Sequence, residues 1–521
     1  MIRIRQIKLP IDHTKEDLIN KICKKLNIKK DNIKNITINK KSIDARKEIY
    51  YTYEVDIETN KEKQILNKKI KDTLKTPNKK YTFIITGEEK LKEKPIIIGA
   101  GPAGLFCAYF LAKNNYKPII IERGEEIDKR IKTVEKFWKE NILNTNSNVQ
   151  FGEGGAGTFS DGKLNTTSKD IRIKEILKIF VENGAPEEIL YIKNPHIGTD
   201  ILREVIKNIR NQIIKYGGKF IFNTCLKDII IKNNQVKQIM INDEIINAEN
   251  IVLALGHSSR DTFRMLIKNN IKINPKPFAI GVRVQHKQKL IDINQYGKEY
   301  EKLPKASYKL TYKSSKGRGV YSFCMCPGGF VVNSSSEKER LVINGMSNYK
   351  RNEENANSAI IVTVSEKDFG TSPLDGVKFQ EKLEQITYKI GQGNIPIQLY
   401  KDFKENVIST NFGKINPVMK GNYTFANLNN IFPEYITKSL IEGIENFNKK
   451  IKGFSDDDTI LAAIESRTSS PIKITRDENL ESNIKGIYPC GEGAGYAGGI
   501  ITSAIDGIKV AEAIAKKYKP F

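Results

Sequence analysis

The stretch that most constrains the fold is KPIIIGAGPAGLFCAYFLAKNNYKPIIIERG, residues 94–124. Isoleucine runs predict two buried strands, and apolar residues at helical spacing predict a helix between them. Gly99 permits a tight turn, Gly101 lets the backbone approach a pyrophosphate, and Gly104 lets the helix pack on the strand. The helix N-terminus attracts phosphate, and Glu122 can accept hydrogen bonds from a ribose. The stretch therefore predicts a βαβ dinucleotide-binding unit.

A second segment, GEGGAG at residues 152–157, has the same glycine spacing. No apolar strand run precedes it, and the following TFSDGKL is not typical of a helix. We interpret it as a glycine-rich loop and not as a second dinucleotide fingerprint.

The C-terminal segment, residues 486–518, distinguishes NAD from FAD. It predicts a strand, the turn Gly491-Glu492-Gly493, and a helix of small residues. An NAD site needs only its βαβ unit, whereas flavoproteins of the glutathione-reductase type close the FAD site with such an element. There the acid bonds the ribitol and the helix N-terminus faces the flavin. Glu492 stands where Asp is usual, and its longer side chain should still reach a ribitol hydroxyl.

The segment IVLALGHSS, residues 251–259, matches the mid-chain strand and turn of the same fold. Together the three elements predict FAD and an α/β architecture. We expect a discontinuous, glutathione-reductase-like Rossmann domain formed by residues 94–270 and 466–521. An α+β substrate or cap domain, residues 271–465, is expected between its two parts.

Residues 1–90 predict a separate ferredoxin-like domain, because their pattern follows the order βαββαβ. Strands are expected at 2–10, 33–44, 49–59 and 79–85, and helices at 15–27 and 61–74. Residues 86–94 are expected to form a polar linker. Over residues 1–94, 25 Lys and Arg against 14 Asp and Glu give a net charge of +11. Such a domain can bind RNA, dock a partner or cover a surface, and the sequence leaves these open.

Composition narrows the class of protein further. The 521 residues suggest about three domains at ~150 residues each. The net charge of +25 is spread along an Ile-, Lys- and Asn-rich chain, which favours a solvated surface over nucleic-acid binding. The first residues lack an apolar leader, and the longest apolar stretch is broken by glycines and Pro102, so we expect a cytoplasmic protein with no membrane span. Six cysteines without a C-x-x-C pair predict neither a disulfide framework nor a zinc site.

The chain resembles the bacterial FAD-dependent dehydrogenase family, a poorly characterised group of NAD(P)/FAD-dependent oxidoreductases with a ferredoxin-like N-terminal extension. The resemblance covers nearly the whole length. It is carried by SIDARK (42–47), GAGPAGLFCAYFLA (99–112), FGEGGAGTFSDGKL (151–164), PHIGTD (195–200), ALGHSSRDTF (254–263), CMCPGGFVV (324–332), ESRTSSP (465–471) and YPCGEGAGYAGGI (488–500). It implies FAD and redox chemistry but no particular substrate.

These interpretations define a set of cofactor-binding candidates: Gly99, Gly101, Ala103, Gly104, Glu122, Arg123, Gly155, Ser160, Gly256, Gly491, Glu492, Gly498, Gly499 and Ile500. The loop at 151–164 is expected to pass the flavin, where Ser160, Asp161 and Lys163 could reach ring atoms or substrate. The alternative is a packing loop without a catalytic member.

Four residues are candidates for catalysis: Cys324, Cys326, Lys163 and Arg467. A thiol near a flavin can act as an acid or redox relay, although a buried cysteine is more often a small hydrophobe. Arg467 could clamp a carboxylate or form a structural ion pair. His196 and His257 are further proton-donor candidates, with a structural role as the commoner alternative.

The flavin itself carries out the redox step. We therefore expect an FAD-dependent reductase or dehydrogenase acting on a small substrate. NADH or NADPH could dock transiently as electron donor, or a redox partner protein could supply electrons, because no second dinucleotide unit is evident. The alternative is a flavoprotein that binds or modifies RNA through its basic N-terminal domain.

Overall fold

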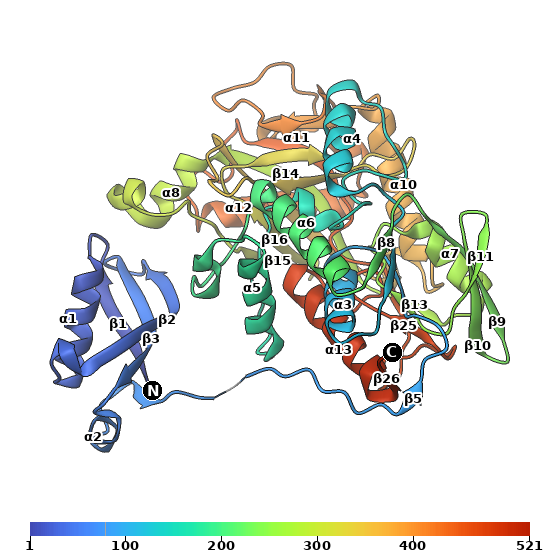
Figure 1. Ribbon diagram of the computed structural model, residues 1–521. Coiled ribbons are helices and arrows are strands. Elements are labelled where there is room, and N and C mark those ends of the chain that lie inside the picture. The colour runs from blue at the N-terminus through green and yellow to red at the C-terminus, as the bar shows by residue number, and fades with distance from the viewer. Residues whose placement is uncertain (79) are drawn as a thin grey trace.

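The computed structural model describes residues 1–78 and 80–521. A small N-terminal domain is joined by an extended segment to a larger body (Figure 1). Within the described residues, no helix combines the length and apolar character needed to cross a membrane.

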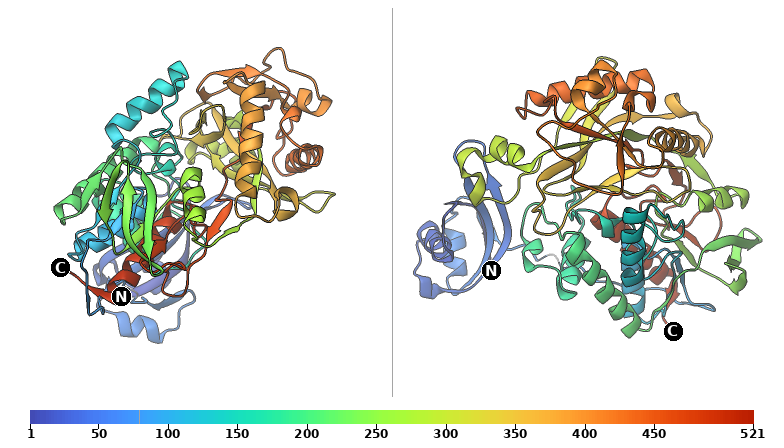
Figure 2. Two further views of the ribbon diagram at one scale, coloured as in Figure 1. Left: turned by 90° about the vertical axis from the view of Figure 1, so that its right-hand side faces the viewer. Right: turned by 90° about the horizontal axis from the view of Figure 1, so that it is seen from above.

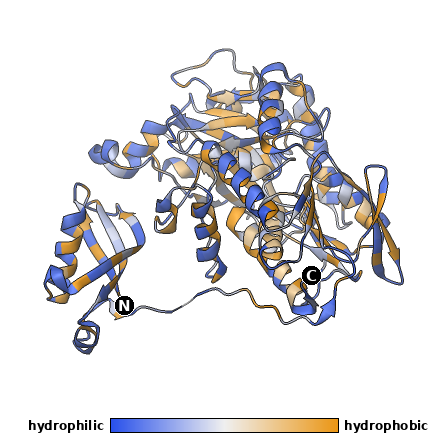
Figure 3. Ribbon diagram, in the orientation of Figure 1, coloured by the Kyte–Doolittle hydropathy of each residue, from blue (hydrophilic) through white to orange (hydrophobic). Residues whose placement is uncertain are grey.

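The N-terminal domain has four antiparallel strands in the order β2-β3-β1-β4. Its elements are β1 (Ile2–Pro10), α1 (Lys15–Leu26), β2 (Ile33–Asp44), β3 (Tyr50–Thr59), α2 (Glu62–Asn67) and β4 (Thr73–Lys75). Helix α1 buries Leu18, Ile22 and Leu26 against one face of the sheet. The opposite side of α1 is hydrophilic (Figure 3). This spacing of apolar residues is what an amphipathic helix on a sheet requires.

The second half of this domain differs from the prediction. The helix expected at 61–74 ends at Asn67, and β4 takes up the last part of that range. Leu74 pairs with Arg3 of β1, so the free edge of β1 captures a segment whose local pattern is helical. Residues 80–85 form no strand; Lys79, part of the same predicted strand, lies outside the described residues.

The connecting segment is bound to the body along its second half. The Tyr81 hydroxyl donates to Glu512 (2.7 Å), and the Phe83 and Phe110 ring centroids are 5.6 Å apart. Residues 86–94 are polar, as expected for a linker, yet Thr86 and Gly87 donate backbone hydrogen bonds to the Ala515 carbonyl. Strand β5 (Glu89–Lys90) pairs with β26 (Tyr518–Lys519), so the segment is fastened to the C-terminal end.

A five-stranded parallel sheet forms the centre of the body, in the order β25-β12-β6-β7-β8. Its strands are β6 (Ile96–Ile98), β7 (Ile119–Ile121), β8 (Lys219–Ile221), β12 (Ile251–Leu253) and β25 (Ile487–Pro489). One face packs on α3 (Pro102–Lys113), α5 (Arg172–Glu182), α6 (Thr199–Lys215) and α13 (Ile500–Lys517). The other packs on α7 (Arg260–Lys268) and the meander β9 (Leu226–Lys232), β10 (Gln235–Ile241) and β11 (Glu244–Asn247). This is the layered Rossmann-type α/β architecture that the sequence predicts.

Glycines allow the two central helices to approach their neighbours closely. A Cβ on Gly104 of α3 would lie 1.9 Å from the Gly99 carbonyl oxygen. A Cβ on Gly507 of α13 would lie 2.1 Å from the Ala103 carbonyl oxygen. Only glycine therefore fits these two positions without moving a helix.

The second part of the body is built around a seven-stranded sheet. Figure 2 shows this part, coloured mainly yellow to orange, from two further sides. Its order is β15 (Thr311–Lys313), β16 (Gly319–Cys326), β19 (Asn355–Val364), β14 (Phe278–Lys287), β23 (Ile460–Glu465), β20 (Ile395–Leu399) and β22 (Tyr423–Phe425). A smaller sheet contains β18 (Ile343–Met346), β17 (Phe330–Asn333) and β21 (Met419–Lys420). Nearby helices include α4 (Ile127–Glu140), α8 (Gln288–Tyr296), α10 (Asp375–Ile390) and α12 (Glu434–Asn448).

Candidate functional site

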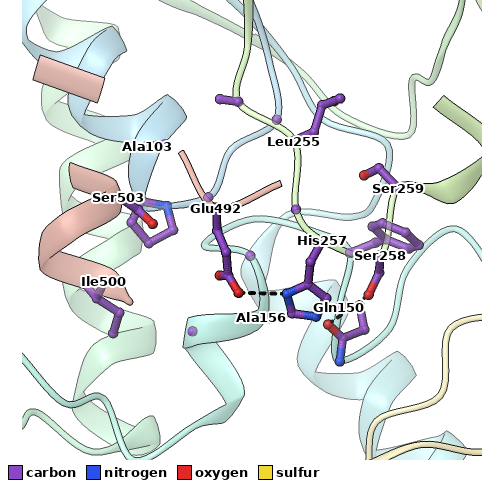
Figure 4. A pocket seen from close by; sticks show the side chains of 18 of the residues that line it. Ala103, Gln150, Ala156, Leu255, His257, Ser258, Ser259, Glu492, Ile500 and Ser503 are labelled. Carbon is purple, nitrogen blue, oxygen red and sulfur yellow. Dashed lines mark hydrogen bonds and ion pairs between the residues drawn. The ribbon is translucent and has the colours of Figure 1, made fainter. Parts of the chain in front are cut away.

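A cavity of about 370 Å³ lies at the carboxyl ends of β6, β12 and β25. The turns that follow these strands form much of its wall, and Figure 4 shows residues from the three turns facing one space. The glycine-rich loop at 150–163 forms another side, and Phe323, Cys324 and Asn344 extend the wall into the second part of the body. The carboxyl edge of a parallel sheet is where α/β proteins bind ligands.

All but two of the cofactor-binding candidates line this cavity. Those on its wall are Gly99, Gly101, Ala103, Glu122, Arg123, Gly155, Ser160, Gly256, Glu492, Gly498, Gly499 and Ile500. Gly104 is set back and serves helix packing. Gly491 has φ of +77° and donates its N–H to Asp506 (2.7 Å), so it shapes the turn after β25.

The glycines leave room for a ligand against the backbone. A Cβ on Gly256, Gly498 or Gly499 would meet no atom within 4 Å, and all three positions line the cavity. A Cβ on Gly155 would lie 3.1 Å from the Gly101 Cα, which shows how closely the two glycine loops approach. The cavity thus has the uncrowded backbone walls and exposed helix N-terminus that a dinucleotide needs.

Glu122 joins two of these walls. Its buried carboxylate accepts hydrogen bonds from the backbone N–H groups of Ala100 (2.8 Å), Gly124 (2.9 Å) and Gly152 (3.0 Å). A carboxylate has about four acceptor positions, so about one remains. Contact with a ribose hydroxyl stays a prediction that this geometry permits.

The glycine-rich loop is organised by Arg130, a residue that sequence reasoning missed. This fully buried guanidinium of α4 donates to five backbone carbonyls, those of Asn148, Val149, Gly152, Glu153 and Gly155. Burial lowers its pKa to about 9, against the opposing charges of Glu122 and Glu153. In the sequence, Arg130 looks like one more charge on an amphipathic helix. The only hint is the adjacent glycine run, whose carbonyls need donors.

Lys163 places a cation at the wall of the cavity. Its Nζ lies 3.1 Å from Asp161 Oδ2 and donates to the Met325 carbonyl. Burial works against the ammonium, but the Asp161 carboxylate outweighs it and raises the pKa of Lys163. Asp161 is also held by Arg351 (Nε to Oδ1, 2.9 Å). An ammonium has three N–H donors, so one remains for a ligand.

The two thiols at the end of β16 have different environments. Cys324 is half-buried and lines the cavity, whereas Cys326 is fully buried behind it and donates to the Cys324 carbonyl (Sγ to O, 3.3 Å). Hydrogen bonding from Cys326 and the charges of Lys163 and Arg283 outweigh burial and lower the pKa of the Cys324 thiol to about 5. Hydrogen bonding with Cys324 and burial raise the pKa of Cys326.

Arg467 reaches the cavity with its donors already engaged. It contacts Glu384 through Nε (3.0 Å) and Nη2 (2.7 Å), and Nη1 donates to the hydroxyls of Ser258 (2.9 Å) and Ser336 (2.6 Å). Arg260 bonds the same Glu384 carboxylate at 2.8 Å. Of the two alternatives for Arg467, these contacts favour the structural ion pair.

Two further candidates, Ser160 and His196, make hydrogen bonds that are typical of a structural role. Ser160 donates to the Gly157 carbonyl (2.6 Å) and accepts from the Gly162 N–H (3.0 Å), so it stabilises its own loop. His196 Nε2 lies 3.0 Å from the Tyr349 carbonyl, its ring stacks on Tyr349, and it is not part of the cavity wall. The commoner, structural role therefore fits His196.

His257 and Glu492 meet across the cavity wall. His257 follows β12, Glu492 follows β25, and Nδ1 and Oε1 are 2.9 Å apart (Figure 4). The other ring nitrogen, Nε2, is buried and has no hydrogen-bond partner among the residues that the structure describes. His257 thus fixes the position of the Glu492 carboxylate on the cavity wall. The prediction that Glu492 binds the ribitol did not include this contact with His257.

Three family models cover successive parts of the chain. Residues 93–291 match the pyridine nucleotide-disulphide oxidoreductase model, and residues 277–468 match that of the FAD-dependent protein, C-terminal domain-like. Residues 1–58 match a domain of unknown function. These matches define an FAD-dependent oxidoreductase, with FAD as its cofactor.

A relative from Clostridium beijerinckii, described as an uncharacterized protein, is 50% identical over 527 residues, covering 99% of each chain. The present chain belongs to the same family, a poorly characterised group of FAD-dependent oxidoreductases.

Similar solved structures include E. coli quinol fumarate reductase FrdA and glycine oxidase from Geobacillus kaustophilus. The first is 11% identical with a TM-score of 0.38, over 82% of this chain and 70% of that one. The second is 11% identical with a TM-score of 0.37, over 82% and 96%. Similarity at this level carries no argument about substrate.

Proposed function

We propose that the protein transfers a hydride or electrons between bound FAD and a small substrate held near Lys163 and Cys324. The observation that supports this is one cavity that joins the turns after three strands of the parallel sheet to an end lined by Lys163, Cys324 and Asn344. In this proposal residues 94–270 and 466–521 hold the cofactor, and residues 271–465 supply the substrate-facing wall.

The cofactor contacts follow from the walls of the cavity. The N-terminal N–H groups of α3 would receive the pyrophosphate, and the remaining acceptor position of Glu122 would receive a ribose hydroxyl. Glu492, oriented by His257, would accept from the ribitol, and Gly498 and Gly499 leave space before the N-terminus of α13. When bound, FAD supplies the two-electron chemistry of the reaction.

The residues at the other end define what the substrate must offer. The remaining N–H of Lys163 can hold an anionic or carbonyl oxygen, because the adjacent Asp161 keeps the ammonium charged. Phe323 gives this end an apolar surface, and the amide of Asn344 gives it a polar one. A small substrate with one anionic or carbonyl group fits these contacts.

NADH or NADPH is the proposed electron donor, and it would dock transiently because the sequence has no second dinucleotide unit. A visible spectrum of the purified protein without oxygen, before and after NADH or NADPH, tests this. Prompt bleaching of a bound flavin is the expected result. An oxidised spectrum that persists would move the proposal to a redox partner protein or to a reducing substrate. A protein that cannot be loaded with FAD would contradict the proposal entirely.

For the RNA alternative, part of the basic charge of the N-terminal domain is already neutralised within the domain. The three cations of β1 are paired with carboxylates of β2 and β3: Arg3 with Asp56 (2.8 Å), Arg5 with Glu54 (3.0 Å) and Lys8 with Asp44 (3.3 Å). Paired charges release few counterions on binding a phosphate backbone. Salt-sensitive RNA binding by the full-length protein would revive this alternative.

A further inference from the structure

The C-x-C pair at the end of β16 carries chemistry beyond electron transfer at the cofactor. Cys324 has φ of +43°, in the left-handed region that residues other than glycine seldom adopt, and such strain gathers at functional sites. The backbone is anchored there because Arg283 Nη1 donates to the Cys324 carbonyl (3.2 Å). The strained residue is also the one of the two cysteines that lines the cavity.

The charges around Cys324 favour a negative sulfur. Lys163 and Asp161 lie on the glycine-rich loop, and Arg283 and Glu465 pair at 3.0 Å on the neighbouring strands β14 and β23. Arg351 adds a third cation through Asp161. Three cations and two carboxylates leave at least one positive charge in excess, which a thiolate at Cys324 balances.

The two thiols are suited to different roles. Because Cys326, Lys163 and Arg283 lower the pKa of the Cys324 thiol below its ordinary range, its sulfur favours the thiolate, the form that attacks disulfides. The pKa of Cys326 is raised, so its thiol keeps its proton until a neighbouring sulfur becomes electrophilic. Cys326 is fully buried, which shields it from solution reagents.

We propose that Cys324 and Cys326 form a dithiol–disulfide couple that reduces a small disulfide entering the cavity. The Cys324 thiolate attacks one sulfur of that disulfide, its S–S bond breaks, and one substrate thiolate leaves. The Cys326 thiol then gives up its proton and attacks the Cys324 Sγ, and the second substrate thiol leaves with that proton. The substrate disulfide gains two electrons, and the cysteine pair becomes a disulfide.

Turnover needs two electrons and two protons to restore the dithiol. We name reduced FAD in the same cavity as the electron donor that restores the dithiol, so this step rests on the proposed function. Reduction of the substrate disulfide by the cysteine pair, the forward half-reaction, does not depend on FAD, because it uses only the electrons of the two thiols. Testing the forward half-reaction alone separates the two proposals.

The test uses the full-length protein with oxidised FAD, treated with a dithiol reductant that is then removed. Dithiodipyridine is the probe disulfide, with thiopyridone release and peptide masses as readouts. Cys225 lines the same cavity, 3.2 Å from the Arg123 guanidinium and outside the C-x-C pair, and is the internal comparison. We expect Cys324 to react at least tenfold faster than Cys225 at pH 6. Two thiopyridones should be released per pair, with a Cys324–Cys326 disulfide as product.

Variants assign the roles. C326S should release one thiopyridone and retain a mixed disulfide on Cys324, and C324S should lose the fast phase. The pH profile of Cys324 labelling should have its midpoint below the ordinary thiol value of about 8.5, and Lys163→Met should move that midpoint upward. Far-UV circular dichroism and the flavin spectrum check that each variant folds.

Two results would overturn the proposal. In the first, Cys324 reacts no faster than Cys225. In the second, the wild-type protein stops at the mixed disulfide; this uses no variant, so a folding defect cannot obscure it. Bleaching of the flavin by NADH or NADPH, measured separately, tests the proposed function without involving the thiols.

Discussion

Two glycine loops with the same spacing border the cavity, and different parts of the chain set their conformations. Residues 99–104 connect a buried strand to α3, so the local order of strand, turn and helix sets their conformation. Residues 152–157 follow no strand, and Arg130 holds them through their carbonyls. Gly152, Gly154 and Gly155 all have positive φ. Equal glycine spacing therefore indicates a turn, whereas the neighbouring elements decide whether it becomes a phosphate loop.

Of the substitutions that test this difference between the loops, replacement of Arg130 should lower the free energy of unfolding the most. Arg130→Met removes the hydrogen bonds that one buried guanidinium makes to five backbone carbonyls, and we expect a loss of about 3–5 kcal/mol in the free energy of unfolding and loss of bound FAD. Arg203 is the matched control, because both guanidinium carbons lie 4.8 Å from the Phe159 ring centroid. Denaturant unfolding should show a change of at most about 1 kcal/mol for Arg203→Met. Equal effects of the two variants would mean that packing, not carbonyl capture, holds the loop.

The last glycine of each loop offers a paired test. Gly104→Ala places a Cβ 1.9 Å from a carbonyl oxygen, so we expect a loss of about 3 kcal/mol and weaker FAD retention. Gly157→Ala meets only the Ile500 side chain, at 3.2 Å, and should cost less than about 1 kcal/mol. Thermal unfolding of both variants checks the order. The reverse order would mean that the second loop is the more constrained one.

Glu122 connects the loops, because it accepts from Ala100 in one and Gly152 in the other. In Glu122→Gln an amide NH₂ replaces one acceptor oxygen, so backbone N–H groups lose a partner. We expect FAD affinity to fall about tenfold, or about 1.4 kcal/mol, in a fluorescence titration. Glu125→Gln is the control, since that carboxylate contacts the Thr133 hydroxyl (2.6 Å) and the Glu125 side chain is not part of the cavity wall. If Glu122→Gln binds FAD with unchanged affinity, Glu122 anchors the two loops but does not contribute to FAD binding.

The sequence predicted the elements whose signals are local. The strands and turns around Gly99, Gly256 and Gly491 were predictable because each combines a buried run with a following glycine, and at Gly99 and Gly491 the positive φ favours glycine. Features that depend on distant partners were not. Glu384 lies on a helix far from Arg467 in the chain, and no local pattern marks either as the other's partner. The local sequence pattern likewise predicts a helix where strand β4 forms, because its partner strand β1 lies about 70 residues earlier in the chain.

The order of strands in the parallel sheet has a consequence for how the protein is made. Strand β25 pairs with β12, and β26 pairs with β5, so chain segments separated by several hundred residues must meet. A nascent chain can fold its N-terminal domain early, because all four strands of that sheet lie within the first 75 residues. The wall formed by Glu492 and α13 is added only after residues 487–517 have been synthesised, long after β12. Until β25 has paired with β12, the parallel sheet exposes the unpaired edge of β12. FAD cannot stabilise the fold by binding before this part of its site has formed.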